Sequence, residues 1–291
     1  MSLEQHYRRD FASNSCGTNR RRSTGTPRSL TSRLASAHLG AYMSVMLAKS
    51  DRKRQTRIGL GLAMLVVVAW FAMHIYAVFF LPLDRSGLVW AVPIIVVLTW
   101  LNVGLFIIAH DAMHGSLAPG HPRLNRALGR MTLLLYAGFW MDRLLPEHFK
   151  HHKHAGTEKD PDFSASHPTG FWRWYGQFIR HYFGLRELVI LHVLVWSYIL
   201  VLGARPEAVG LFWGVPAILS SLQLFYFGTF RPHRHEAAPF ANDHRSRSNE
   251  YGWLASLLTC FHFGYHNEHH LNPGIPWWGL PGERRRRKAG A

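Results

Sequence analysis

The chain has 291 residues, which is enough for one or two domains with a buried core. It carries 33 Lys and Arg against 17 Asp and Glu, and the resulting net charge of +16 is typical of proteins that bind nucleic acid or lie at a membrane. The basic residues gather in RRRSTGTPR, KSDRKRQTR, HRSRS and RRRRK, outside the long apolar runs, and no recognised nucleic-acid module is present, so we expect a membrane protein that binds no nucleic acid.

Residues 1–57 form a basic stretch for which we predict a disordered N-terminal extension. No acidic residue occurs between Phe11 and Ser50, while Arg and Ser are abundant. The same composition is typical of transit peptides, and a start of translation at Met43 is a further alternative. We expect residues 58–281 to form the membrane domain and residues 282–291 to form a basic C-terminal tail.

Two uncharged apolar runs open the membrane domain. Ile58 to Leu81 and Leu88 to Ala109 each exceed the ~20 residues that a transmembrane helix needs. The segment between them, PLDRSG, is rich in residues that break helices. The pair therefore predicts a helical hairpin.

A second hairpin is predicted from Leu188 to Leu202 and Val209 to Phe230, joined by GARPEA. Its first arm is short and contains His192, so a partly inserted helix is the alternative. The apolar piece from Met131 to Trp140 is too short to cross a bilayer. We expect it to lie in the membrane interface or to pack as a core helix.

Three histidine clusters recur along the chain: HDAMH at 110–114, HFKHH at 148–152 and HNEHH at 266–270. Residues i, i+3 and i+4 share one face of a helix, so the second and third clusters each present three imidazoles together. The i, i+4 spacing of the first cluster is one by which a helix offers two nitrogens to a single metal. Three unrelated solvated histidine patches are the alternative.

The charges beside the spans predict where these clusters meet. If the five basic residues from Lys49 to Arg57 stay in the cytoplasm, the first hairpin leaves and returns, and His110 emerges on the cytoplasmic side. The second hairpin then brings the third cluster back to the same side. We therefore predict an all-α integral membrane protein with about four transmembrane helices in two hairpins and a cytoplasmic histidine-rich cap.

Eight clustered imidazoles predict more than one metal ion. Neutral His suits iron, zinc, copper and nickel, so the ligand type leaves the metal open. A tetrahedral zinc takes only four ligands, and a catalytic zinc keeps three from the protein. Two metals at the mouth of an apolar helical bundle favour dioxygen chemistry at C–H bonds over hydrolysis.

At this point the sequence resembles a known family. FIIAHDAMHGS, HFKHHKHAGTEKDPDF, FGTFRPHR and LLTCFHFGYHNEHHLNPGIPWW look like the histidine-box segments of bacterial and cyanobacterial β-carotene ketolases, within the membrane fatty-acid-desaturase-like superfamily. RWYGQFIRHYFGLRE resembles the segment that connects them, and the similarity runs from about residue 58 to 281. The resemblance implies two irons, dioxygen and an external electron donor.

The resemblance also implies which side chains bind iron. Those of the three clusters are His110, His114, His148, His151, His152, His266, His269 and His270. His233, four residues after Thr229, is a ninth candidate, and a histidine at the membrane interface is the alternative. His154 and His262 flank the clusters and would lie beside the ligands or in the substrate pocket, unless they have no role.

Carboxylates next to the clusters are candidates for holding the ligands in place. A histidine bound to a metal usually donates its other N–H to a carboxylate or a carbonyl. The candidates are Asp111, Asp160, Asp162 and Glu268. Asp160 has an alternative role as a helix N-cap, because Pro161 follows it and Pro is favoured at the first helical position.

The implied reaction is the oxygen-dependent oxidation of C4 of the β-ionone ring of β-carotene to a ketone, giving echinenone and canthaxanthin, or astaxanthin from hydroxylated rings. An acyl-lipid desaturase or a carotenoid hydroxylase is the alternative. A metal transporter would need polar or charged residues inside its spans, and the spans hold no Asp, Glu, Lys or Arg and only two histidines, His74 and His192. Because no Gly-rich phosphate loop is present, the electrons would come from a ferredoxin-like or other redox partner. Cys16 and Cys260 are too few for a disulfide framework.

Overall fold

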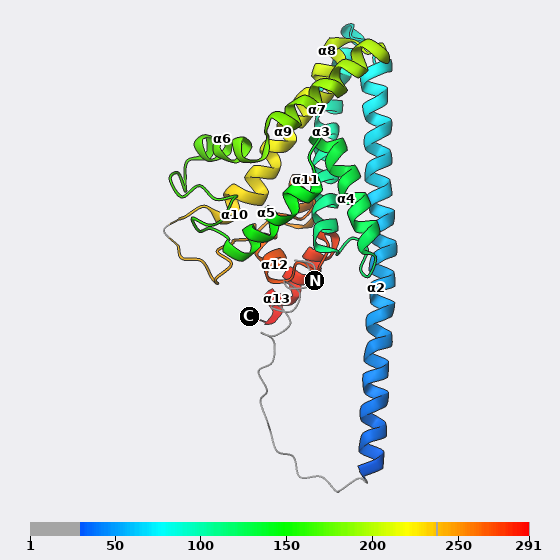
Figure 1. The fold of residues 1–291 in the computed structure, drawn as a ribbon, viewed down its shortest axis with the longest axis vertical. Helices are drawn as coiled ribbons and strands as arrows, with labels where there is room; N and C mark the ends of the chain where they lie inside the picture. The colour runs from blue at the N-terminus through cyan, green and yellow to red at the C-terminus, as the bar shows by residue number, and fades with distance from the viewer. Residues whose placement is uncertain (1–29, 237, 291) are drawn as a thin grey trace. The chain divides into compact units, whose positions relative to one another are not determined.

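The computed structural model describes residues 30–236 and 238–290, with side chains from residue 50 onward (Figure 1). The chain divides into two units, Met1–Ala48 and Lys49–Ala291, and the histidine clusters all lie in the second. Helices are the only regular elements in the described residues, and the predicted all-α class is confirmed. Residues 1–29 of the predicted extension lie outside the described part, and helix α2 (Leu30–Ile75) begins well before the expected boundary at residue 58.

Three helical stretches among the described residues are long and apolar enough to cross a membrane. They are Ser50–Phe80, Arg85–His114 and Pro206–His233. The first ends in the π-helical turn η1 (Tyr76–Phe80), and the second is α3 (Arg85–His114). The third is a chain of short elements: α8 (Pro206–Val209), η3 (Gly210–Gly214), α9 (Val215–Phe225), η4 (Tyr226–Phe230) and α10 (Arg231–His233).

Helix α3 carries the first histidine cluster at its end. The Asp84 side chain caps its start by accepting hydrogen bonds from the backbone N–H of Ser86 at 3.0 Å and of Gly87 at 2.9 Å. Its end is fixed by Gly115, which has a φ of 68° that a residue without Cβ adopts freely. The predicted span from Leu88 to Ala109 is thus extended at both ends, and His110 and His114 lie on its last turns.

The predicted first arm of the second hairpin forms a span only together with the helix before it. Helices α6 (Phe171–Tyr182) and α7 (Leu185–Trp196), the latter continued by η2 (Ser197–Val201), are apolar enough as a pair but are bent by 81° at their junction. The bend lies at Gly184, whose backbone N–H donates to Glu187 Oε2 at 2.9 Å, and this contact starts a new helix. Arg143 Nη1 lies 3.1 Å from Glu187 Oε1 and so connects the bend to α5 (Met141–His154).

Short helices place the remaining clusters beside α3. Helix α4 (Pro122–Ala137) contains most of the predicted piece from Met131 to Trp140 and packs against α3, as does α9 (Figure 1). Helix α5 (Met141–His154) carries the second cluster and α12 (His266–Leu271) carries the third. The other elements of this part are α11 (Trp253–Cys260), the 3-10 turn η5 (Trp277–Gly279) and α13 (Leu280–Gly290). The predicted basic tail is thus helical as far as Gly290.

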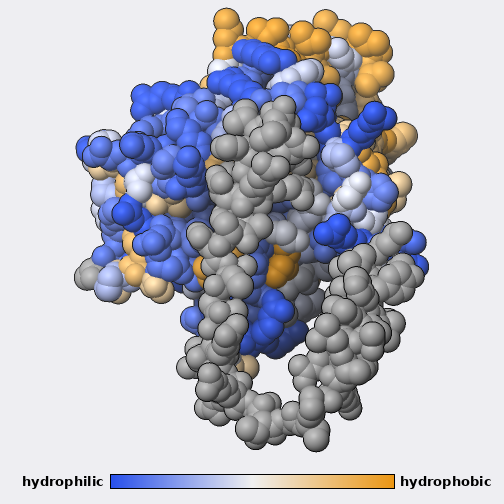
Figure 2. All heavy atoms as spheres, turned by 60° about the horizontal axis from the view of Figure 1, so that its bottom comes forward, coloured by the Kyte–Doolittle hydropathy of each residue, from blue (hydrophilic) through white to orange (hydrophobic). Residues whose placement is uncertain are grey.

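The core and the surface of the second unit differ as expected for a membrane protein. Gly104 lets the loop after α11 approach α3 closely, because a Cβ there would lie 2.8 Å from the Phe261 ring and 2.9 Å from Val66. Large apolar side chains such as Leu65, Val89 and Val92 are exposed, as they would be against lipid. Figure 2 turns the end of the unit near α12 and α13 toward the viewer, where the coloured surface is mostly hydrophilic with hydrophobic residues along its upper rim.

Candidate metal centre

Nine histidines gather into two adjacent groups. The five-histidine group consists of His110, His114, His148, His152 and His269. The four-histidine group consists of His151, His233, His266 and His270. In each group, one ring nitrogen per residue lies within 4.8 Å of all the others, which is the spacing of ligands around a common ion. The structure therefore brings together all nine histidines that the sequence suggested as ligands.

Each His-x-x-His-His cluster contributes to both groups. In α5, His148 and His152 belong to the five-histidine group and His151 to the other. In α12 the division is reversed, because His266 and His270 join the four-histidine group while His269 joins the five-histidine group. Side chains at i and i+4 differ by about 40° around a helix and i+3 lies about 60° to the other side of i, so one cluster faces two neighbouring positions.

Within each group, ring nitrogens of neighbouring imidazoles lie about 3 Å or less apart. His269 Nε2 lies 3.0 Å from His152 Nε2, and His148 Nε2 lies 2.6 Å from His114 Nε2. In the other group, His266 Nε2 lies 3.0 Å from the Nε2 atoms of both His270 and His233. The facing nitrogens converge on two small volumes rather than pointing outward to solvent.

Burial keeps most of these imidazoles neutral. Desolvation lowers the pKa of His148, His152, His266, His269 and His270 well below the usual value, and the neighbouring histidines lower it further. A neutral imidazole has a free lone pair, which is the form that binds a metal. His110 supports the same interpretation, because neither of its buried ring nitrogens has a hydrogen-bond partner among the described residues.

His151 is held by a carboxylate. Asp160 Oδ1 lies 2.9 Å from His151 Nδ1, and the same side chain accepts backbone N–H groups from Gly156 at 2.8 Å and Asp162 at 2.9 Å. Although burial lowers the pKa of His151, the carboxylates of Asp160 and Asp162 outweigh it and raise the pKa to about 9. The alternative role of Asp160 as a helix N-cap is wrong, because residues 161–170 form turns and the next helix begins at Phe171.

The other carboxylates make different contacts. Asp162 Oδ1 accepts a hydrogen bond from the Tyr182 hydroxyl, while its Oδ2 lies 3.7 Å from His151 Nδ1, too far for a hydrogen bond. Asp111 Oδ2 accepts the backbone N–H of Trp277 at 3.1 Å. Glu268 accepts hydrogen bonds from the Ser248 hydroxyl and, at 2.8 Å, from Arg284 Nη1. Asp111 therefore holds the backbone at Trp277, and Glu268 holds the side chains of Ser248 and Arg284. Neither makes a hydrogen bond to an imidazole, since Asp111 Oδ1 lies 3.7 Å from His110 Nδ1.

His233 lies inside the four-histidine group and is 1% exposed. Its Nδ1 lies 2.8 Å from the backbone carbonyl of Arg245, and because a carbonyl only accepts, Nδ1 carries the hydrogen. Nε2 is then the free nitrogen, and it faces His266. His154 and His262 belong to neither group, and the His262 ring stacks on Tyr265 and Trp277 with centroids 6.0 and 6.1 Å away.

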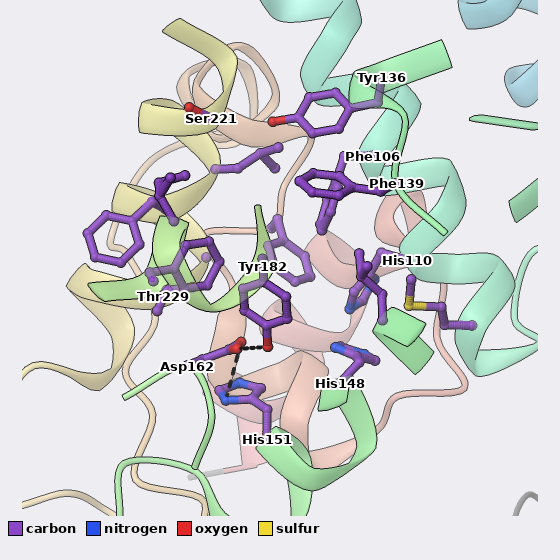
Figure 3. A pocket seen from close by; sticks show the side chains of 18 of the residues that line it. Phe106, His110, Tyr136, Phe139, His148, His151, Asp162, Tyr182, Ser221 and Thr229 are labelled. Atoms are coloured by element: carbon purple, nitrogen blue, oxygen red, sulfur yellow. Dashed lines mark hydrogen bonds and ion pairs between the residues drawn. The ribbon is translucent and has the colours of Figure 1, made fainter. Parts of the chain in front are cut away.

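A pocket opens against both groups (Figure 3). Its wall at one end is made by His110, His148 and His152 of the five-histidine group and His151 and His266 of the four-histidine group. Its sides are aromatic and aliphatic, with Phe106, Phe139, Phe178, Phe225, Phe263, Met113, Leu144, Ile179 and Leu224. Figure 3 shows Tyr136 and Ser221 at the opposite end from the histidines. With its mouth included, the pocket holds about 920 Å³ of space free of atoms.

The arrangement of two imidazole groups at the end of an apolar pocket agrees with what comparison with known proteins shows. The sequence matches the family model described as fatty acid desaturase over residues 88–208 and 185–290. The chain belongs to this family. It is 50% identical to a beta-carotene ketolase of Paracoccus sp. (strain PC1) over 79% of this chain and 93% of that protein.

More distant relatives have similar names. A beta-carotene ketolase of Haematococcus lacustris is 35% identical over 78% of this chain and 79% of its own length. A zeaxanthin 4-ketolase of Chlamydomonas reinhardtii is 37% identical over 77% of this chain and 52% of its own length. Family membership therefore extends to the ketolase branch that the histidine-box segments resemble.

Two contacts at the centre of this family member could not be found from the sequence. Arg245 acts through its backbone carbonyl, which any residue has, so its side chain gives no signal. Tyr182 belongs to RWYGQFIRHYFGLRE, which the resemblance covers, but no residue pattern pairs this tyrosine with Asp162, which lies on the turn before α6.

Proposed function

We propose that the chain is a di-iron β-carotene ketolase that oxidises C4 of a β-ionone ring to a ketone. The single observation that carries this proposal is the juxtaposition of the five-histidine and four-histidine groups with one apolar pocket. The names of the relatives support the substrate and the reaction. Dioxygen is the co-substrate, and the carotenoid enters from the lipid bilayer.

The proposed ligands of the two irons are the nine histidines, with one iron in each group. The donor chemistry suits iron, because imidazole is a common ligand of that metal and burial favours the neutral form of rings such as His152 and His270 by lowering their pKa. Bound iron would supply the activation of dioxygen and the oxidising power for the C4–H bond. The chain positions the substrate, excludes water and sets the electrostatic environment of the reaction.

Residues next to the ligands keep the imidazoles oriented. Asp160 accepts from His151 and the Arg245 carbonyl accepts from His233, so in each ring Nδ1 is occupied and Nε2 is left to bind metal. Asp111 holds the backbone at Trp277, and Glu268 is clamped between Ser248 and Arg284. We assign these carboxylates a supporting role, not the binding of iron.

The pocket takes the ring end of the carotenoid. Its phenylalanines match an apolar cyclohexene ring and exclude water, while the histidine wall defines which carbon lies next to the irons. Two successive hydroxylations at C4 give a geminal diol, which loses water to form the ketone. Each hydroxylation consumes a dioxygen molecule, two electrons and two protons and releases a water, so an external donor such as a ferredoxin must supply four electrons per ketone.

We also propose the arrangement in the membrane. The three apolar stretches and the bent pair of α6 and α7 with η2 would form two hairpins, with the histidine groups in a cap on the cytoplasmic side. The five basic residues from Lys49 to Arg57 favour this orientation. The hydrophilic end near α12 and α13 in Figure 2 is the face from which a soluble redox partner would approach.

Expression in a bacterium that accumulates β-carotene tests the proposed function. Extracted pigments are identified by mass and retention, with the His152→Ala variant as the control. We expect 4-keto products from the native chain and unchanged β-carotene from the variant. Products with an added double bond in lipid acyl chains, or hydroxylation at C3 without any ketone, would identify an acyl-lipid desaturase or a carotenoid hydroxylase in its place.

A further inference from the structure

Asp162 is the one carboxylate among the described residues that line the pocket. It lies at the histidine end, where Figure 3 shows it beside Tyr182 and His151. Its side chain is 15% exposed and is part of the pocket lining. A carboxylate oxygen that faces a largely apolar pocket is costly unless it accepts a hydrogen bond.

The two oxygens of Asp162 are in different situations. Oδ1 accepts a hydrogen bond from the Tyr182 hydroxyl, which fixes the plane of the carboxylate. Oδ2 accepts no hydrogen bond among the described residues, and His151 Nδ1 lies 3.7 Å from it, too far for one. That nitrogen is already bound by Asp160 at 2.9 Å, so Asp162 is not needed to hold the imidazole.

The proposed reaction produces a hydrogen-bond donor at this place. β-Carotene brings only C–H bonds into the pocket, but the first hydroxylation leaves a hydroxyl group on C4. A hydroxyl group in an apolar pocket without a partner is destabilised and would tend to leave. Elsewhere in the pocket, Ser221 is already engaged, because its Oγ donates to the Ile218 carbonyl at 2.8 Å and lies 2.6 Å from the Tyr175 hydroxyl.

We infer that Asp162 Oδ2 accepts the hydrogen of the C4 alcohol and so retains this intermediate for the second oxidation. The inference rests on the proposed ketolase function. With the C4 oxygen held at Asp162, the remaining C4–H bond stays directed at the histidine wall, and the ring is oxidised again before it can dissociate. Asp162 would thereby determine that the product is a ketone and not an alcohol.

The Asp162→Asn variant tests this role. Because the Tyr182 hydroxyl keeps the side-chain oxygen at the Oδ1 position, the amide NH2 takes the place of Oδ2. The NH2 can donate to the alcohol oxygen but cannot accept the alcohol hydrogen, so a hydrogen bond to a charged acceptor is replaced by a weaker neutral one. In cells that supply β-carotene, we expect the ratio of released 4-hydroxy to 4-keto ring ends to rise about tenfold, as for the loss of one hydrogen bond to a charged acceptor. With the C4 alcohol supplied as substrate, KM should rise by a similar factor relative to KM for β-carotene.

Asp160→Asn is the matched comparison, because Asp160 contacts His151 and does not line the pocket. That variant should lower iron content and lower alcohol and ketone together, with their ratio unchanged. If Asp162→Asn behaves in this way, Asp162 serves the metal ligand and the inference is overturned. An unchanged ratio with normal iron content would overturn it as well.

Two further measurements keep the test decisive. If Asp162→Asn does not accumulate in the membrane, Asp162→Glu replaces it in the test. Glu keeps a carboxylate acceptor but displaces it by one methylene, so the ratio of 4-hydroxy to 4-keto ring ends should rise, though by less than expected for Asn. An unchanged ratio would refute the inference. If the native chain makes no oxygenated carotenoid at all, the proposed function is refuted. If the native chain makes the ketone and Asp162→Asn gives the same ratio of 4-hydroxy to 4-keto ring ends, only the role of Asp162 is refuted.

Discussion

Replacing Asp160 by Ala should weaken iron binding in the four-histidine group selectively. The substitution removes the acceptor of three hydrogen bonds, from His151 Nδ1 at 2.9 Å, Gly156 N–H at 2.8 Å and Asp162 N–H at 2.9 Å. Carboxylates that hold a metal-bound histidine are worth about 10–100-fold in metal affinity, which is ~1.4–2.8 kcal/mol. The five-histidine group makes no contact with Asp160, so its affinity should stay close to that of the native chain.

The assay is chelator competition on protein purified in detergent. Iron retained per chain is measured against chelator concentration, and the native chain should lose its iron in two overlapping steps. In Asp160→Ala, one step should move to a 10–100-fold lower chelator concentration while the other stays in place. Glu158→Ala is the control, because Glu158 is exposed on the same turn. If Asp160→Ala and Glu158→Ala retain iron equally at every chelator concentration, the Asp160 carboxylate does not hold His151 in the iron-loaded protein.

Three other perturbations follow from the same geometry. His152→Ala and His270→Ala should each abolish ketone formation, and the double variant should be no worse than either, because ligands of one centre act as a unit; ketone retained in either single variant would contradict this. His233→Ala leaves three histidines in its group and should lower bound iron from about two to about one per chain by metal analysis, whereas a full complement would return His233 to the role of an interfacial residue. Gly104→Ala should destabilise the folded chain by ~1–3 kcal/mol in thermal unfolding, because the new Cβ would lie 2.8 Å from Phe261, and Gly61→Ala, with no atom within 4 Å, should not; equal melting temperatures would show that α3 is not tightly packed there.

The histidine centre could be predicted from the sequence because its signal is local. Spacings within HFKHH and HNEHH state which imidazoles share a helix face, and the structure has α5 and α12 at these places. The spacing does not show how the histidines divide between the five-histidine and four-histidine groups. His151 and His152 are neighbours in the chain but belong to different groups, and this division depends on how α5 and α12 pack against each other.

Elements that are fixed by a run of apolar residues could be predicted from the sequence. Elements that are fixed by tertiary contacts could be predicted less well. The first two spans were located from hydropathy alone, although both are longer than the apolar runs because polar turns continue the helix. The arm from Leu188 was a weaker prediction, since the bend before it depends on the contact between Gly184 and Glu187. The alternative role of Asp160 as a helix cap is wrong because no helix follows it: the chain forms turns after Pro161, and α6 begins only at Phe171.

The dependence of ketone formation on bound iron tests the central claim most directly. Purified protein stripped of metal is reloaded with increasing iron and supplied with β-carotene, dioxygen and a reduced ferredoxin. Because both histidine groups border the same pocket, activity should be close to zero at about one iron per chain and reach its maximum at about two. Full activity at one iron per chain, or with zinc in place of iron, would contradict the proposal that the two groups form one di-iron centre.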